Sequence, residues 1–161
     1  MARVQLALYR GPGTTAAHRL AHALTVVVLT LRCLRGCPWS HAELVVDGVC
    51  HSSSVRDGGV RAKSIDLTTG RWDVIDMPTV NAEEALARFA ERNGLGYDWP
   101  GALRWGLPFL RQRPRADYCF EVVAYMLGTI GPAIIMQTVL PTSTERAKLR
   151  QFIASLSGVT M

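Results

Sequence analysis

The chain has 161 residues, of which 48% are hydrophobic and 19% charged, and its formal net charge is +5. This length and composition predict a single domain over residues 1–161 with a core of its own, and they argue against long intrinsic disorder. The basic excess is mostly arginine, which suits an anionic partner. Because no nucleic-acid motif accompanies the charge, we expect no nucleic-acid binding.

No targeting or membrane-spanning segment is predicted. The apolar run at the N-terminus is too short for a signal peptide. The most apolar segment, Ala21–Leu34, falls short of the roughly 20 residues that cross a bilayer, so we expect a buried or surface-lying helix there. The predicted location is therefore the cytoplasm, where free thiols are expected of the four cysteines, Cys33, Cys37, Cys50 and Cys119.

The first half of the chain has the pattern of a small sheet. Alternating side chains over 4–9 predict a strand that ends at the Gly11-Pro12-Gly13 turn, and a helix of about 20 residues should follow. Asp47-Gly48 between two apolar runs predicts a hairpin with strands at 41–46 and 49–52. A second strand pair is expected at Gly59–Ile65 and Arg71–Met77.

The second half has helical signals. Asn81 should cap a helix, with Glu84 reaching back to it and Gly94 ending it. Its expected apolar face is Ala85, Leu86, Phe89 and Ala90. After the basic loop Arg111–Arg115, another helix should run from about Asp117 to Gly128. A last helix is predicted after Pro141-Thr142, with Leu149, Phe152, Ile153 and Leu156 facing inward. The fold class is therefore α+β, with a central antiparallel sheet packed against helices.

Cys119 is the candidate nucleophile. The predicted helix begins within two residues of it, so its sulfur should lie among unpaired backbone N–H groups at the positive end of the helix dipole. That environment favours the thiolate, which is the nucleophilic form of cysteine. The alternative is a small buried side chain without chemistry.

His41 is the candidate base, because it opens a strand where its ring can emerge at the end of the sheet. His18 and His22 share a face of the first predicted helix and are less suitable. The hairpin register would place Glu43 on the same side of the sheet as His41, together with Ser52 and Ser54, and would place His51 on the other side. Glu43, His51, a serine or a backbone group therefore remain alternatives for the group that orients His41, because a bulge would reverse the sides.

Zinc is a weaker hypothesis. Cys33, Cys37 and His41 are spaced four residues apart, and His22 or Cys50 could add a fourth ligand. Gly36 and Pro38 interrupt the helix that this spacing requires. No metal or other cofactor is therefore predicted.

These motifs, taken in order, resemble a known family. Ser40-His41-Ala42-Glu43 opens a strand, Arg56-Asp57-Gly58-Gly59-Val60 follows a serine-rich turn, Tyr97-Asp98-Trp99 comes later, and Tyr118-Cys119-Phe120-Glu121 begins a helix. In this order the chain resembles the circularly permuted NlpC-type, papain-like cysteine hydrolases. They are related to lecithin-retinol acyltransferase and are often encoded by bacteria and phages.

The resemblance implies a papain-like fold and an acyl-enzyme reaction on amide or ester bonds. Cys119 would be the nucleophile, His41 the base, and a third polar residue on the sheet, for which Glu43 is our candidate, would orient the imidazole. The expected substrate is a peptide or acyl compound, for instance one derived from peptidoglycan. The alternative is a catalytically silent module that uses the basic loop and the Ala21–Leu34 segment to contact a protein or a membrane surface.

Overall fold

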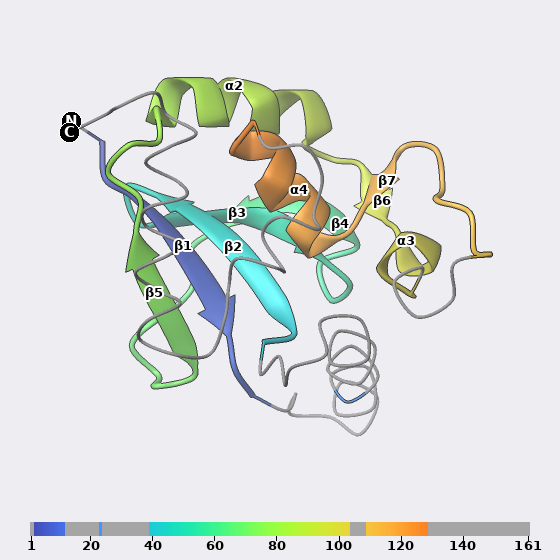
Figure 1. The fold of residues 1–161 in the computed structure, drawn as a ribbon, viewed down its shortest axis with the longest axis horizontal. Helices are drawn as coiled ribbons and strands as arrows, with labels where there is room; N and C mark the ends of the chain where they lie inside the picture. The colour runs from blue at the N-terminus through green and yellow to red at the C-terminus, as the bar shows by residue number, and fades with distance from the viewer. Residues whose placement is uncertain (1, 12–22, 24–38, 104–108, 129–161) are drawn as a thin grey trace.

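The computed structural model describes residues 2–11, 23, 39–103 and 109–128. Its strands are β1 (Val4–Tyr9), β2 (His41–Val46), β3 (Val49–Ser54), β4 (Gly59–Lys63), β5 (Trp72–Asp76), β6 (Gly96–Tyr97) and β7 (Ala116–Asp117), and its helices are α2 (Ala82–Arg92), α3 (Trp99–Leu103) and α4 (Cys119–Met126). The strands form one sheet in the order β5-β1-β2-β3-β4-β6-β7 (Figure 1). The predicted α+β class is confirmed.

The predicted hairpin is present with the expected turn. Asp47 and Gly48 have φ angles of 48° and 81°, the left-handed values that a tight turn between twisted strands needs. Val46 pairs with Val49, and Leu44 pairs with His51. β1 pairs antiparallel with the other edge of β2, so β2 lies inside the sheet rather than at its rim.

The second predicted strand pair is corrected by the structure. Both strands exist, as β4 and β5, but β4 pairs with β3 while β5 pairs with the outer edge of β1. The outer edge of β4 is occupied by β6, where Gly59 pairs with Gly96, so β5 uses the edge of β1 instead. β6 and the parallel strand β7 were not predicted, because two-residue strands are too short to show an alternating pattern.

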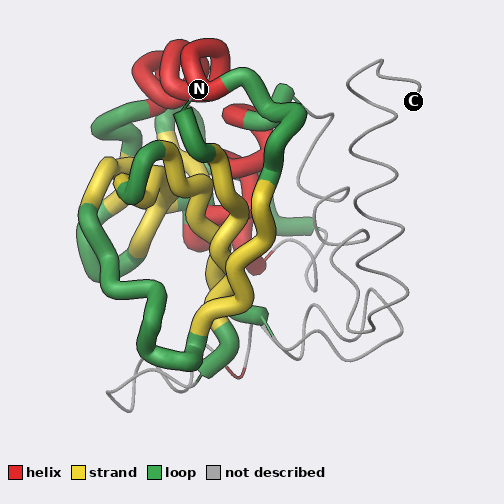
Figure 2. The backbone as a smooth tube through the Cα atoms, turned by 90° about the vertical axis from the view of Figure 1, so that its left-hand side faces the viewer, coloured by secondary structure: helices red, strands yellow, loops and turns green. Residues whose placement is uncertain are grey.

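Both faces of the sheet are buried. α2 and α4 cover one face and contribute to a core in which Leu6, Leu8, Leu44 and Val123 are almost completely buried (Figure 1). On the opposite face Ala7, Val45 and Cys50 form a smaller cluster, against which Ile65, Leu67 and Trp72 pack. Figure 2 shows the strands as one twisted layer beside the helices. Alternate side chains along β2 point to opposite faces of the sheet, and both sets are therefore enclosed.

The predicted cap of α2 is confirmed. The Asn81 side chain accepts hydrogen bonds from the backbone N–H groups of Glu83 and Glu84, at 3.0 and 3.3 Å. The Glu84 carboxylate accepts a hydrogen bond from Arg88 one turn later rather than reaching back to the cap. Gly94 follows the helix with a φ of 85°, as expected of a helix stop.

The predicted apolar face of α2 is only half correct. Ala85 and Phe89 are buried, whereas Leu86 is 37% exposed and Ala90 is exposed. α2 packs mainly on one other helix, α4. A narrow apolar stripe along α2 is therefore enough to cover this contact.

Several predicted elements lie outside the described residues. These are the helix after Gly13, apart from Ala23, and the helix after Pro141. In the part of the chain that the structure describes, every helix is too short or too polar to cross a membrane.

Gly59 allows the close approach of β4 and β6, and we expect Gly59→Ala to destabilise the fold. A Cβ atom there would lie 2.0 Å from the carbonyl oxygen of Leu95, at a φ of 151°. The free energy of unfolding from urea denaturation should fall by more than about 2 kcal/mol. Gly58→Ala is the matched control: its φ is 83° but no atom lies within 4 Å, so a loss of only about 1 kcal/mol is expected. Equal losses in the two variants would contradict the role of the close approach.

Candidate active site

Cys119 is the first residue of α4 and is 3% exposed. The residue before it, Tyr118, is extended and makes no side-chain cap. The first intrahelical bonds are donated by Glu121 and Val122 to the carbonyl of Tyr118, so the N–H groups that precede them are available at the positive end of the helix. The predicted placement of the cysteine at a helix start is confirmed.

The start of α4 is tied to the sheet through β7. The Ser53 hydroxyl on β3 donates a hydrogen bond of 2.6 Å to the carbonyl oxygen of Asp117. The same oxygen accepts a bond of 3.2 Å from the backbone N–H of Asp98. Because both bonds end two residues before Cys119, the start of α4 is held by residues that are distant in sequence, one on β3 and one just after β6.

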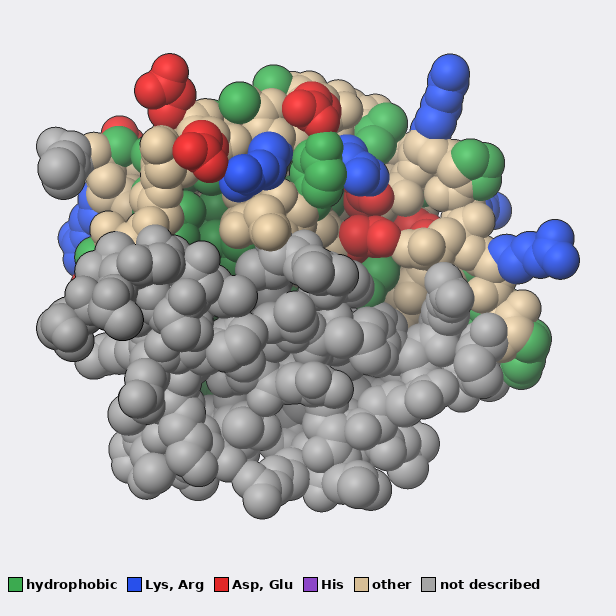
Figure 3. Space-filling model, turned by 45° about the horizontal axis from the view of Figure 1, so that its top comes forward, with side chains coloured by type: hydrophobic (Ala, Val, Ile, Leu, Met, Phe, Trp, Pro, Cys, Tyr) green, Lys and Arg blue, Asp and Glu red, His purple; other side chains and the backbone are tan. Residues whose placement is uncertain are grey.

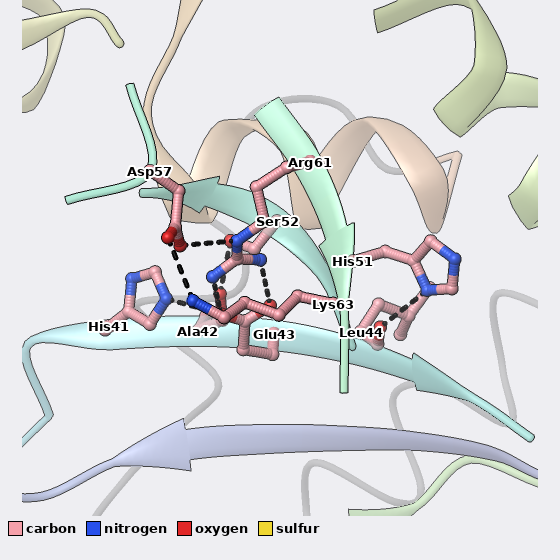
Figure 4. A network of polar contacts seen from close by, with 9 residues as sticks. All are labelled: His41, Ala42, Glu43, Leu44, His51, Ser52, Asp57, Arg61 and Lys63. Carbon is pink, nitrogen blue, oxygen red and sulfur yellow. Dashed lines mark hydrogen bonds and ion pairs between the residues drawn. The ribbon is translucent and has the colours of Figure 1, made fainter. Parts of the chain in front are cut away.

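His41 is the first residue of β2, and its side chain is 23% exposed. Its Nε2 lies 2.7 Å from Oε1 of Glu43 (Figure 4). The imidazole also interacts electrostatically with the side chain of Cys119. Because Nε2 is occupied by the carboxylate, Nδ1 is the nitrogen left to exchange a proton with the thiol.

The charges around His41 favour its protonated form. Burial by itself lowers the pKa of His41, but Cys119 and Glu43 outweigh it and raise the pKa to about 10. The imidazole is therefore an imidazolium at neutral pH, the form that pairs with a thiolate and can later protonate a leaving group.

Glu43 is completely buried. Both of its oxygens accept hydrogen bonds from Arg61: Nη1 lies 2.8 Å from Oε2, and Nη2 lies 2.6 Å from Oε1 (Figure 4). Burial raises the pKa of Glu43, but Arg61 and His41 outweigh it, so the net pKa is lowered. The carboxylate is therefore ionised.

His51 lies on the other side of the sheet, as the hairpin register predicts. Its ring packs edge-on against Phe89 of α2, with ring centroids 4.7 Å apart, and its Nδ1 lies 3.3 Å from the carbonyl oxygen of Leu44. Figure 4 shows the ring pointing away from His41. Of the alternatives left open for the third residue, the structure brings Glu43 to His41, and it does not bring His51.

Arg61 was not predicted from the sequence to be a member of the candidate site. It is paired opposite Ser52 in the register of β3 and β4, and Ser52 is the residue predicted to face Glu43. Extending the register by one strand would have placed Arg61 and Glu43 in one row across the sheet. Ser52 is on β3, the strand between β2 and β4, and its hydroxyl donates to the carbonyl oxygen of Ala42, at 2.6 Å.

Tyr97 belongs to one of the sequence motifs, in which no role was predicted for it, and it interacts with Cys119. Its hydroxyl interacts electrostatically with Cys119; burial, Cys119 and Tyr118 all raise the pKa of Tyr97. The phenol therefore stays protonated and can donate a hydrogen bond. Its ring also packs on Trp99, with centroids 5.2 Å apart, and Trp99 is 41% exposed.

The other sequence predictions for the cysteines concern free thiols and a zinc site. Cys50 and Cys119 are free thiols. Burial and the neighbouring Glu43 raise the pKa of Cys50 to about 11, so this thiol stays protonated at neutral pH. Cys33 and Cys37 lie outside the described residues, and within the described ones no three His, Cys, Asp or Glu side chains are grouped so as to hold a metal ion.

Comparisons with known proteins assign no family to the chain. No protein-family model matches it, and no significant match was found among curated proteins or solved structures. The function is therefore inferred from the geometry of the described residues and from the order of the motifs.

The positions of Cys119 and Glu43 on either side of His41 lead to a prediction for the pKa of His41. Glu43→Gln removes a negative charge next to the ring, so the midpoint should fall from about 10 by about 1 to 3 pH units. NMR of the imidazole resonances measures this directly. His51 is an internal comparison: burial is the largest influence on its pKa and lowers it, and the Glu43 charge is a smaller influence that raises it, so the midpoint of His51 should fall less than that of His41. An unchanged midpoint of His41 would contradict the assigned pairing.

Proposed function

We propose that the chain is a cysteine hydrolase, or a related acyltransferase, with a papain-like fold of the permuted NlpC type. One observation carries the proposal: the His41 imidazole interacts with the Cys119 thiol while its Nε2 is bound to the buried Glu43. A thiol at a helix start, a base and a charged group that orients the base are the parts that nucleophilic acyl transfer needs.

In the proposed reaction Cys119 and His41 begin as a thiolate–imidazolium pair, in which Nδ1 of His41 holds the proton of the thiol, and the thiolate attacks the carbonyl carbon of an amide or ester. The oxyanion that forms is stabilised by backbone N–H groups at the start of α4. The imidazolium returns the proton to the leaving amine or alcohol, whose bond to carbon breaks and leaves a thioester on Cys119. His41 then deprotonates a water molecule, or an alcohol or amine acceptor, that attacks the thioester and releases the thiol.

Two features support the papain-like fold as part of this proposal. The chain has the motif order of the permuted enzymes, with the histidine before the cysteine. The base opens a strand within the sheet, and the nucleophile opens a helix that packs on β2 and β3. The substrate class that fits is a peptide amide or an acyl ester, with cell-wall peptides as one source.

The reaction is tested by trapping its intermediate. Incubation with an activated acyl ester, such as p-nitrophenyl acetate, should add one acyl group to Cys119, detected by peptide mass spectrometry. Cys119→Ser and His41→Ala should lower the acylation rate by about 100-fold or more. Cys50→Ser is the matched control and should acylate Cys119 at the wild-type rate. Acylation that persists in Cys119→Ser, or that is independent of His41, would contradict the proposed reaction.

A second candidate function, contact with a membrane surface, is favoured by one end of the molecule. Phe109 is 75% exposed and Trp99 is 41% exposed. Arg111, Arg113 and Arg115 in the neighbouring loop are exposed, and none of them is ion-paired with another described residue. Basic side chains project from this end in Figure 3, near an exposed apolar side chain. Aromatic rings beside arginines suit an anionic lipid interface.

This surface is tested by vesicle sedimentation. Binding to vesicles that contain phosphatidylserine should weaken when Arg111, Arg113 and Arg115 are replaced together by glutamine, by roughly 1 kcal/mol for each arginine at low salt. Arg3→Gln, in an exposed pair with Asp76 on β5, is the control. Equal binding by the triple variant and the control would exclude the electrostatic part of this function. The predicted contribution of Ala21–Leu34 lies almost entirely outside the described residues.

A further inference from the structure

Arg61 lies next to the candidate active site. Both terminal nitrogens of its guanidinium group contact Glu43, the third residue of that site. Nη2 donates to Oε1 of Glu43 and Nη1 donates to Oε2. Oε1 is also the atom that binds Nε2 of His41. A carboxylate held at both oxygens cannot rotate about its terminal bond without breaking a charged hydrogen bond, so the fork also determines which oxygen faces His41.

The surroundings of Glu43 make this pairing necessary. The carboxylate is fully buried on the sheet face that carries Ala7, Val45 and Cys50. A carboxylate in such a place is costly when ionised and tends to take up a proton unless a cation compensates it. Arg61 and His41 are the two cationic groups that bind it among the described residues.

Arg61 is itself held in place from behind. Its Nε donates to Oδ2 of Asp57 at 2.9 Å, and Nζ of Lys63 donates to the other oxygen of Asp57 at 2.9 Å (Figure 4). The side chain of Arg61 is only 14% exposed. The turn between β3 and β4 therefore fixes the guanidinium at one end, while Glu43 engages the other.

We propose that Arg61 is a positioning residue of the active site, which keeps Glu43 ionised and keeps its Oε1 on Nε2 of His41. This inference rests on the proposed function and deepens it. With Arg61 present, the row of thiolate, imidazolium, carboxylate and guanidinium has no net charge. Without Arg61 the same row has one uncompensated buried negative charge, so the thiolate forms less readily.

The test compares Arg61→Lys and Arg61→Met with the control Arg3→Gln. Arg61→Lys keeps the positive charge but loses the fork, and Arg61→Met loses both. The first readout is the downfield proton resonance of Nε2–H of His41 in NMR, which reports the bond to Glu43 whether or not Cys119 reacts. The second is the rate of alkylation of Cys119 by iodoacetamide at pH 6.5. Arg61→Lys keeps a cation beside Glu43 and carries the test if Arg61→Met does not fold.

We expect the Nε2–H resonance to be lost or broadened in both Arg61 variants and retained in Arg3→Gln. Alkylation of Cys119 should slow by about 10-fold or more in Arg61→Lys and further in Arg61→Met. A wild-type resonance and rate in Arg61→Lys would overturn the proposal, because charge alone would then be sufficient. If Cys119 is inert in the wild type, the proposed function fails, and the resonance still decides the role of Arg61.

Discussion

The buried carboxylate of Glu43 is the group on which the arrangement of the site depends. It receives His41 on one side and the guanidinium of Arg61 on the other, and an ionised carboxylate in this position is stable only while both contacts are present. Together with Cys119, the same charge raises the pKa of His41, so the imidazole is held in its protonated form next to Cys119. The contacts of the Glu43 side chain inside the sheet therefore influence the reactivity of the Cys119 thiol.

The sheet supplies this geometry because β2 is an inner strand. Tyr9 and Ala7 of β1 pair with His41 and Glu43, and β3 and β4 follow on the other side. Both faces of β2 are covered, one by helices and the other by the segment after β4. Glu43 can therefore be excluded from water while His41, at the end of the strand, remains partly exposed. Cys119, the proposed nucleophile, begins α4, and Ser53 of β3 holds the chain just before that helix.

Local signals in the sequence predicted most of the site. The Asp47-Gly48 turn determines the hairpin register, which separates His41 and Glu43 from His51, and the helix start places Cys119. Non-local contacts were not predictable in the same way. The strands of β4 and β5 were recognised, but their partners depend on which sheet edges are free. Arg61 was not predicted because its contact with Glu43 spans three strands. To find it, the strand register had to be extended from the β2–β3 hairpin to β4.

The most direct test of the central claim, that Cys119 and His41 act as a pair, is the rate of iodoacetamide alkylation of each cysteine as a function of pH, by peptide mass spectrometry, in the wild type and in His41→Ala. The account predicts that Cys119 reacts rapidly below pH 7 and that this reaction slows without His41. Cys50, whose pKa is raised to about 11, should not react in that range. If Cys119 reacts no faster than Cys50, or equally fast without His41, the catalytic pair is contradicted.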